Sequence, residues 1–213
     1  MIKVVLILVL VSINNLLFAS EYTYENDYRI RYSENYLENI PVKNNDGSFN
    51  AVIEIPSGTN QKWIIDQETN SLELEFQNSL PTIIKYLPFP TNFGILVNTN
   101  SLSNGNKDGN PINILVLNEN PIERGDVVKV KIIGMLRLEN NGKIENQIIS
   151  VKVGSIFEKI KSLKELEKEY IGILEIFSIW FKNYKNVNNK ILGYDERKKT
   201  INFIEEHISF KNE

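Results

Sequence analysis

Residues Val127–Glu139 read VVKVKIIGMLRLE, a run rich in valine, isoleucine and leucine that is typical of a β-strand. Shorter runs of the same kind surround it: AVIEI at 51–55, KWIID at 62–66, LELEF at 72–76, INILVL at 112–117 and QIISVKV at 147–153. Asparagine and glycine separate these runs, and they come before any clear helical pattern. The sequence therefore predicts an antiparallel sheet or small barrel over residues 50–153.

After Gly154 the spacing of the apolar residues changes. Ser162 and Glu165 have the separation of a capping box at the start of a helix. Apolar residues then recur at intervals of three or four, which predicts one helical face packed on the core: Leu163, Leu166, Tyr170, Leu174, Phe177, Phe181 and Tyr184. A last helix is expected over residues 195–209. Its His207, the only histidine of the chain, is expected at the surface.

Length and composition indicate one domain and narrow the class of partner. The chain has 213 residues, 42% of them hydrophobic, enough for a single sizeable core. Its formal net charge is -3 and no basic stripe occurs, which disfavours a nucleic-acid binder. The absence of cysteine excludes disulfides, thiolate metal sites and a cysteine nucleophile. Small molecules or proteins are therefore the expected partners.

The N-terminal segment, residues 1–20, has the outline of a signal peptide. Lys3 precedes an apolar run from Val4 to Val11, and the small residues Ala19 and Ser20 follow as cleavage positions. A spanning helix needs about 20 apolar residues, and this run is shorter. We expect cleavage and a periplasmic or secreted protein. The alternative is a protein anchored to the membrane by the uncleaved segment.

Residues 21–38 form a tyrosine-rich extension that fits neither the helical nor the strand period. Its tyrosines are Tyr22, Tyr24, Tyr28, Tyr32 and Tyr36. A terminal extension that packs a few rings on the domain is the favoured interpretation. An aromatic arm that docks a cell-envelope protein is the alternative.

Three ordered motifs resemble family I soluble inorganic pyrophosphatases. They are NIPVKNNDGSFNAVIEIP at 39–56, PFPTNFG at 88–94 followed by DGNPINILV, and WFKNYK at 180–185 followed by LGYDERKKTINFIEEH. The resemblance covers about residues 39–210. It implies an α+β, mainly β fold for a domain at residues 39–213: a five-stranded OB-like β-barrel with two C-terminal helices packed on it.

The resemblance also implies a chemistry. In this family several Mg²⁺ ions hold diphosphate, and a water bridging two of the ions attacks one phosphorus. Mg²⁺ requires oxygen ligands in near-octahedral geometry. Two such ions clamp the attacking and leaving oxygens, so the cavity needs several fixed anions.

Part of the family's residue set is retained. The resemblance implies that Glu54, Asp108 and Glu145 are metal ligands. It implies substrate binding by one lysine on a strand and by a tyrosine and a lysine near the C-terminal end: Lys62, Tyr184 and Lys185.

Other positions of the family pattern have lost their charge. Asn110 stands at the water-activating position, Asn113 at the ligand shared by two metals, and Asn140 at a further metal ligand. Neutral or apolar residues also replace a glutamate, an arginine, a lysine and two tyrosines, at Ile64, Phe76, Gln147, Phe89 and Phe93. Asn110 cannot act as a carboxylate base, a role worth about 10² to 10⁴ in rate.

The intact family framework, these losses and the signal-like N-terminal segment together predict an exported, catalytically degenerate member of the family that acts as a binding or interaction module. Its cofactor is then Mg²⁺ or none. The expected partners are pyrophosphate or another phosphorylated small molecule, a cell-envelope protein, or a second copy of the chain, and not nucleic acid. The alternative is an active Mg²⁺-dependent diphosphatase that uses Asp108, Glu54 and Glu145 with fewer metals.

Overall fold

The computed structural model describes residues 22–33, 36–66, 69–100, 102–103, 106–107, 110–185 and 189–208. The predicted signal segment and the predicted metal ligand Asp108 lie outside these ranges. Among the described residues, no helix is both long enough and apolar enough to cross a membrane.

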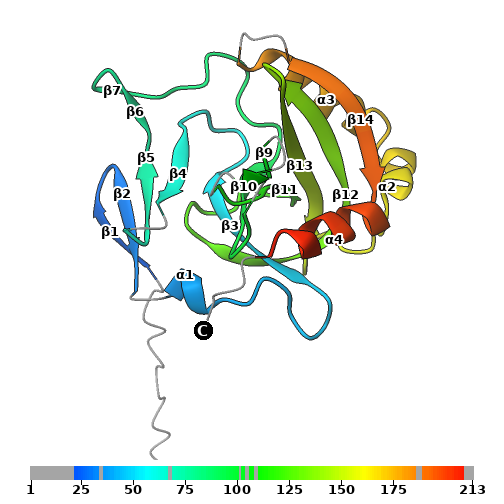
Figure 1. The fold of residues 1–213 in the computed structure, drawn as a ribbon, viewed down its shortest axis with the longest axis horizontal. Helices are drawn as coiled ribbons and strands as arrows, with labels where there is room; N and C mark the ends of the chain where they lie inside the picture. Colours follow the sequence, from blue (N-terminus) through cyan, green and yellow to red (C-terminus); the bar gives the residue numbers. More distant parts are fainter. Residues whose placement is uncertain are drawn as a thin grey trace, which may run out of the picture.

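The main sheet curls into a partly closed ring, which confirms the predicted OB-like barrel (Figure 1). Its strand order is β13-β11-β8-β3-β12-β14, and β13 pairs with β12 as well as with β11. Five strands therefore form the ring, while β14 extends the sheet beyond β12. The bounds are β3 Phe49–Ile55, β8 Asn92–Leu96, β11 Asn113–Leu117, β12 Val127–Asn140, β13 Lys143–Lys152 and β14 Asn189–Glu196.

The long apolar run that begins at Val127 forms β12, which pairs with three other strands. It pairs with β3 near its start, with β13 along most of its length and with β14 from Gly134 onward. Gly134 is required at this crossing. A Cβ there would lie 2.5 Å from the side chain of Leu163 and 2.8 Å from the carbonyl oxygen of Asp195.

The tyrosine-rich extension forms a hairpin, β1 (Tyr22–Asn26) and β2 (Arg29–Tyr32), on a second sheet. This sheet has the order β1-β2-β5-β4, with β4 at Trp63–Asp66 and β5 at Ser71–Leu74. Tyr32 is buried, and its hydroxyl donates to the Gly125 carbonyl oxygen over 2.9 Å. The extension thus packs rings on the domain as predicted. The remaining short elements are α1 Tyr36–Asn39, β6 Phe76–Gln77, β7 Leu80–Pro81, β9 Leu102–Ser103 and β10 Asn106–Lys107.

Three helices, not two, follow the barrel strands, which corrects the predicted number. The predicted single face is divided into α2 (Leu163–Glu169) and α3 (Ile173–Asn183). Gly172 adopts a φ of +86° at the start of α3, a left-handed conformation that a continuous helix excludes.

The predicted cap at Ser162 is present, since its hydroxyl accepts from the Glu165 N–H over 3.1 Å. The Glu165 carboxylate accepts from Lys161, one residue before the position that a capping box requires.

The last helix, α4 (Arg197–Glu206), is shorter than expected because residues 195–196 belong to β14. The expectation that His207 is exposed is wrong, since only 2% of this residue is accessible. Its Nδ1 lies 2.6 Å from the Phe203 carbonyl oxygen, and its own carbonyl oxygen accepts from the Asn100 N–H. The end of α4 is thereby tied to the loop after β8, and the ring of Phe203 lies 4.2 Å from the imidazole between centroids.

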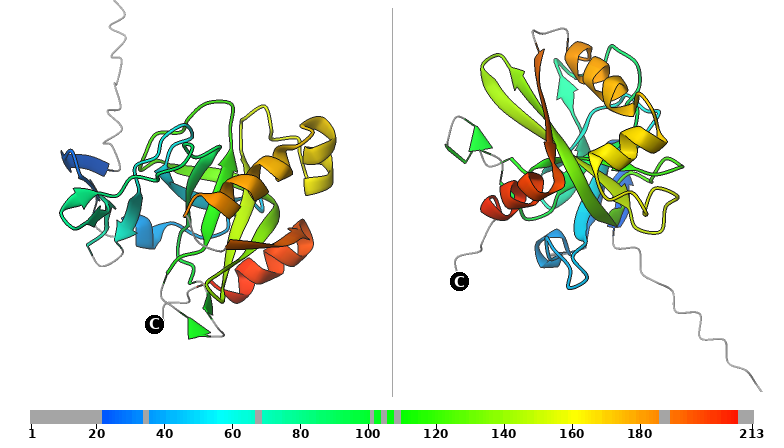
Figure 2. Two further views of the ribbon diagram at one scale, coloured as in Figure 1. Left: turned by 90° about the horizontal axis from the view of Figure 1, so that it is seen from above. Right: turned by 90° about the vertical axis from the view of Figure 1, so that its right-hand side faces the viewer.

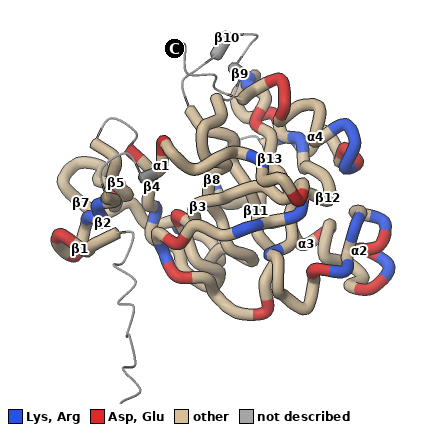
Figure 3. Tube along the Cα trace, turned by 90° about the horizontal axis from the view of Figure 1, so that it is seen from below, with Lys and Arg blue, Asp and Glu red and all other residues tan. Residues whose placement is uncertain are grey.

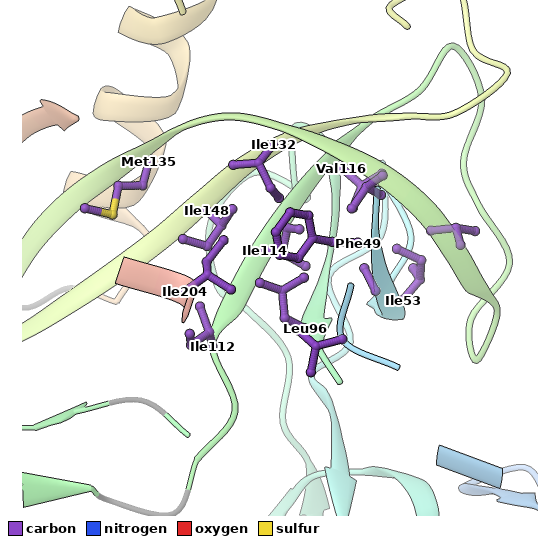
Figure 4. Packing of buried hydrophobic residues seen from close by; sticks show 14 of the residues in the cluster. Phe49, Ile53, Leu96, Ile112, Ile114, Val116, Ile132, Met135, Ile148 and Ile204 are labelled. Carbon is purple, nitrogen blue, oxygen red and sulfur yellow. The ribbon is translucent and has the colours of Figure 1, made fainter. Parts of the chain in front are cut away.

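Two apolar clusters hold the barrel and helices together. Figure 4 shows the cluster to which Phe49, Ile53, Leu96, Ile114 and Ile148 contribute from the barrel strands, with Ile204 of α4 beside them. The second cluster joins the barrel to α2 and α3 through Leu136, Ile149, Leu163, Phe177 and Trp180. The helices α2, α3 and α4 lie on the side away from β1 and β2 (Figure 2).

Candidate functional site

Three of the predicted site residues meet where β12, β13 and the end of α3 come together. The Asn140 side-chain amide donates to Glu145 Oε1 over 2.7 Å. The Lys185 ammonium nitrogen lies 3.2 Å from each Glu145 carboxylate oxygen. The tight β12–β13 turn, in which Asn140 pairs with Lys143, positions Asn140 and Glu145. The negative charge of Glu145 is therefore balanced by a cation of the same chain.

Tyr184 completes this Glu145 group. Its ring stacks on Trp180 with a centroid separation of 4.6 Å and an interplanar angle of 17°. Burial raises the pKa of the Tyr184 phenol above its ordinary value. Burial by itself lowers the pKa of Lys185. The interactions with Tyr184 and Glu145 are stronger together, so the pKa of Lys185 is raised above its ordinary value. Lys185 therefore stays charged at neutral pH.

Two positions at which the family resemblance implies a lost charge are neighbours in the barrel. Asn113 on β11 pairs in parallel register with Gln147 on β13. Gln147 is two residues from Glu145, so the two side chains leave the same face of β13. Only 1% of Gln147 is accessible, and its buried Oε1 has no hydrogen-bond partner within the described part of the chain. Such an atom calls for a ligand or a water.

Glu54 on β3 and Lys62, just before β4, form a second group. A bulge in the pairing of β3 with β8 falls at Glu54, and a bulge re-aims the side chain it carries. Glu54 is 5% exposed, and its Oε1 accepts from the Ile65 N–H over 2.8 Å. Burial raises the pKa of Glu54 to about 7, against the opposing effects of that hydrogen bond and of Lys62. Lys62 is paired with Glu75 at 2.6 Å.

An aromatic stack links the retained motifs. The ring of Phe93 lies 5.0 Å from that of Phe89, which lies 4.4 Å from Trp180. The Trp180 indole N–H donates to the carbonyl oxygens of Leu87 and Pro88. The two phenylalanines thus keep a packing role without a hydroxyl. Sequence reasoning missed Trp180 as a site residue, although it begins the quoted WFKNYK motif.

The edge near Lys62 is apolar where the family pattern has charge. Ile64 is 39% exposed and Phe76 is 46% exposed. Asn110 is exposed and precedes β11. These three positions offer no charge to an incoming anion or cation.

The donor set described by the structure does not fit a group of Mg²⁺ ions. Among the described ranges, no three His, Cys, Asp or Glu side chains lie close enough to hold a metal. Glu145 is engaged by Lys185, and Glu54 is buried with a backbone N–H on its carboxylate. Mg²⁺ prefers several accessible anionic oxygens, and these two glutamates do not supply them together.

Comparison with known proteins agrees with the fold. Residues 51–211 match the family model described as inorganic pyrophosphatase. The inorganic pyrophosphatase of Campylobacter jejuni is 28% identical over 179 residues, covering 81% of this chain and 96% of that protein. The type I inorganic pyrophosphatase from P. falciparum superposes with a TM-score of 0.78 at 24% identity, over 87% of this chain and 70% of that one. The Thermus thermophilus structure gives 0.69 at 22% identity, over 81% and 97%.

Proposed function

Because the chain belongs to the inorganic pyrophosphatase family, we propose that it is an exported member that keeps the fold as a binding or interaction module and has lost efficient pyrophosphate hydrolysis. The observation that carries this proposal is the Glu145 group. Its carboxylate faces the ammonium of Lys185 at 3.2 Å and the amide of Asn140 at 2.7 Å. A carboxylate held in this way is a poor ligand for a divalent cation.

The neighbouring positions support the same conclusion. Asn113 and Gln147 are paired across β11 and β13, and both side chains are neutral. An amide oxygen supplies a dipole where the family pattern has a full charge, and metal affinity depends on the number of charged ligands. Asn110 cannot remove a proton from water as a carboxylate would. Weaker metal binding and the absence of a carboxylate base would both slow the attack of water on pyrophosphate.

A ligand without a metal fits the residues better. Lys185 supplies a positive charge, Tyr184 supplies a phenol, and the buried amide of Gln147 has an unpartnered oxygen. Ammonium and phenol groups donate hydrogen bonds to phosphate oxygens, and an amide oxygen accepts from a hydroxyl. We therefore infer that the ligand is a phosphorylated small molecule that carries a hydroxyl or protonated phosphate oxygen.

A phosphate-release assay with pyrophosphate and Mg²⁺ tests the catalytic part of this proposal. We expect turnover far below the range of about 1 to 10³ s⁻¹ that is usual for enzymes. Turnover within that range would support the alternative, a diphosphatase that uses Asp108, Glu54 and Glu145. Removal of Mg²⁺ by a chelator should then abolish the activity.

Titration calorimetry with inorganic phosphate and with pyrophosphate, each in the absence of divalent metal, tests the binding part. We expect binding that is lost in Lys185→Ala. Lys182→Ala is the matched control, because Lys182 is exposed on α3 one turn earlier. Equal binding by both variants, or binding by neither the native chain nor Lys182→Ala, would overturn the role given to the Glu145 group.

A further inference from the structure

Two hairpins at one edge of the molecule expose large apolar side chains. Tyr24 and Tyr28 on the β1–β2 hairpin are 61% and 52% exposed. Phe76 and Leu80 on the β6–β7 hairpin are 46% and 69% exposed. We call these four residues the hairpin face. Grouped exposed apolar side chains usually mark a surface that is covered by something else.

The two hairpins form one surface. The rings of Tyr28 and Phe76 meet edge to face, with centroids 5.4 Å apart. The Leu74 N–H donates to the Tyr28 carbonyl oxygen over 2.9 Å, so the strand leading into β6 is held against the β1–β2 turn. Figures 1 and 3 both place β1, β2 and β7 at the same edge, opposite α2 and α3. The Tyr28–Phe76 contact thus joins the two hairpins, which lie at the opposite edge from α2 and α3.

Three of the four charged residues of the β1–β2 hairpin, Glu25, Arg29 and Arg31, take part in ion pairs. Residues 22–32 contain two arginines and two acidic residues, so their formal charge is zero. Arg29 pairs with Glu73 at 2.8 Å, and Arg31 pairs with Glu25. A face of this kind has little attraction for a charged partner. Tyrosine and phenylalanine rings on a neutral surface are the side chains that favour the boundary between lipid headgroups and acyl chains.

The sequence before the hairpin face indicates which surface covers it. Tyr22 begins β1, and residues 1–21 precede it directly, including the apolar run Val4–Val11. This segment joins the described chain at Tyr22, in the hairpin that carries Tyr24 and Tyr28, so an attachment through it is tethered beside the hairpin face. The attachment and the exposed rings would then contact one surface together.

We propose that the hairpin face lies on the surface of a lipid bilayer, and that the N-terminal apolar segment stays uncleaved and attaches the chain there, which is the alternative to cleavage given above. The domain is then held in one orientation, with α4 directed away from the lipid. This inference does not depend on whether the Glu145 group binds phosphate or hydrolyses pyrophosphate. It can fail while the proposed function stands, and the reverse also holds.

The absence of cysteine makes a site-specific test simple. Single substitutions Gln77→Cys on β6 and Lys198→Cys on α4, both at exposed positions, carry a fluorescent label in the full chain. Each is mixed with neutral phosphatidylcholine vesicles that contain a lipid-bound quencher. The apolar side chains of an interfacial protein lie about 5 to 10 Å into the headgroup and acyl boundary, within reach of a shallow quencher. We expect strong quenching at position 77 and little at position 198.

Equal quenching at both positions would mean that the domain has no fixed orientation, and would overturn the proposal. Absence of quenching at position 77 would overturn it as well, since a protein partner or residues 1–21 would then be the better candidate for covering the face. Quenching that disappears in about 1 M salt would also contradict it, because charge attraction between exposed groups is screened at that ionic strength.

Substitution of the face itself provides the second measurement. In the Gln77→Cys background, Phe76→Ser with Leu80→Ser should reduce quenching to the level seen at position 198. Ile171→Ser is the matched control, because Ile171 is 89% exposed between α2 and α3 at the far side. It should leave quenching unchanged. Circular dichroism confirms folding of each variant, and full quenching in the folded double variant would exclude the hairpin face as the contact.

Discussion

The ammonium nitrogen of Lys185 lies 3.2 Å from both carboxylate oxygens of Glu145. This one relationship joins the end of α3 to the β12–β13 turn across 40 residues of sequence. It also places a positive charge beside the carboxylate that the family resemblance implies to be a metal ligand. A divalent cation at Glu145 would have to displace that ammonium or tolerate it at close range, and both cost free energy.

The Lys185–Glu145 pair should contribute little to stability. Their side chains are 38% and 28% exposed, and ion pairs of this exposure contribute about 0 to 1 kcal/mol. We expect Lys185→Gln to lower the free energy of unfolding by less than about 1 kcal/mol in urea titrations. Lys182→Gln is the control. A loss above about 3 kcal/mol would show that the pair is needed to hold the fold, as is typical of buried pairs.

Restoring two carboxylates should not restore catalysis. We expect Asn110→Asp with Asn113→Asp to hydrolyse pyrophosphate no faster than the native chain. Ile64, Asn140 and Gln147 remain, and Lys185 still occupies Glu145. Phosphate release is measured with Mg²⁺ for both proteins side by side. Substantial rescue would show that the rest of the cavity is competent and that the proposed loss of function rests on these two positions alone.

Stability should fall as the pH rises through neutrality because of Glu54. Burial raises its pKa from 4.5 to about 7 in the folded chain, so folding favours the protonated carboxyl. Its stabilising effect is complete below pH 4.5 and is lost as the pH approaches 7. The free energy of unfolding should therefore decrease by roughly 3 kcal/mol across this window from this group.

Glu54→Gln checks the assignment, because glutamine resembles the protonated carboxyl in shape and carries no charge. We expect the variant to be more stable than the native chain at pH 8 and similar at pH 4.5. Urea unfolding at both values measures the difference. Glu75→Gln, on a half-buried residue paired with Lys62, is the control. An unchanged pH dependence in Glu54→Gln would show that another group is responsible.

Trp180 should be needed for the aromatic stack and for the loop before β8. We expect Trp180→Phe to cost about 1 to 2 kcal/mol, since a ring is kept while the hydrogen bonds to Leu87 and Pro88 are lost. Trp180→Ala should cost about 3 to 5 kcal/mol, because it leaves a cavity beside Phe89. Urea unfolding followed by circular dichroism gives both values. Equal costs would mean that the ring itself contributes nothing.

Gly134→Ala should destabilise the barrel. The added methyl group would meet the Leu163 side chain at 2.5 Å and a backbone oxygen at 2.8 Å, so α2 or β14 must shift. Overpacking of this kind costs about 1 to 3 kcal/mol. Thermal unfolding should show a lower midpoint. Lys143→Ala, at an exposed position on β13, is the control, and an equal effect in both variants would contradict the close approach.

Local patterns were sufficient for the β region and for the start of α2. The apolar runs at 51–55, 112–117 and 147–153 coincide with barrel strands, and Ser162 caps its helix as predicted. The break at Gly172 was not visible, because the apolar spacing continues across it. The strand β14 was missed for a related reason, since ILGYDE was assigned partly to the following helix and only its pairing with β12 makes it a strand.

The candidate site was also predicted only in part from the sequence. The family resemblance implied that Glu145, Lys185 and Asn140 belong to one cavity, and the fold places Asn140 and Lys185 within hydrogen-bond distance of Glu145. No residue pattern indicated that Lys185 would pair with Glu145, or that Glu54 would be buried. Those facts depend on which strands are neighbours and on how α3 ends against the barrel.

The order and kind of the residues determined the mainly β architecture, the cap at Ser162 and the neutral amides at Asn110, Asn113 and Asn140. These properties are local, since hydrogen-bonding capacity, charge and side-chain periodicity belong to the residues themselves. Only the tertiary structure decided that Glu145 faces an ammonium, that His207 is covered, and that Asn113 lies beside Gln147. Burial and pairing arise when segments far apart in the chain pack together, and the free energies that set the state of a carboxyl or an imidazole depend on those neighbours.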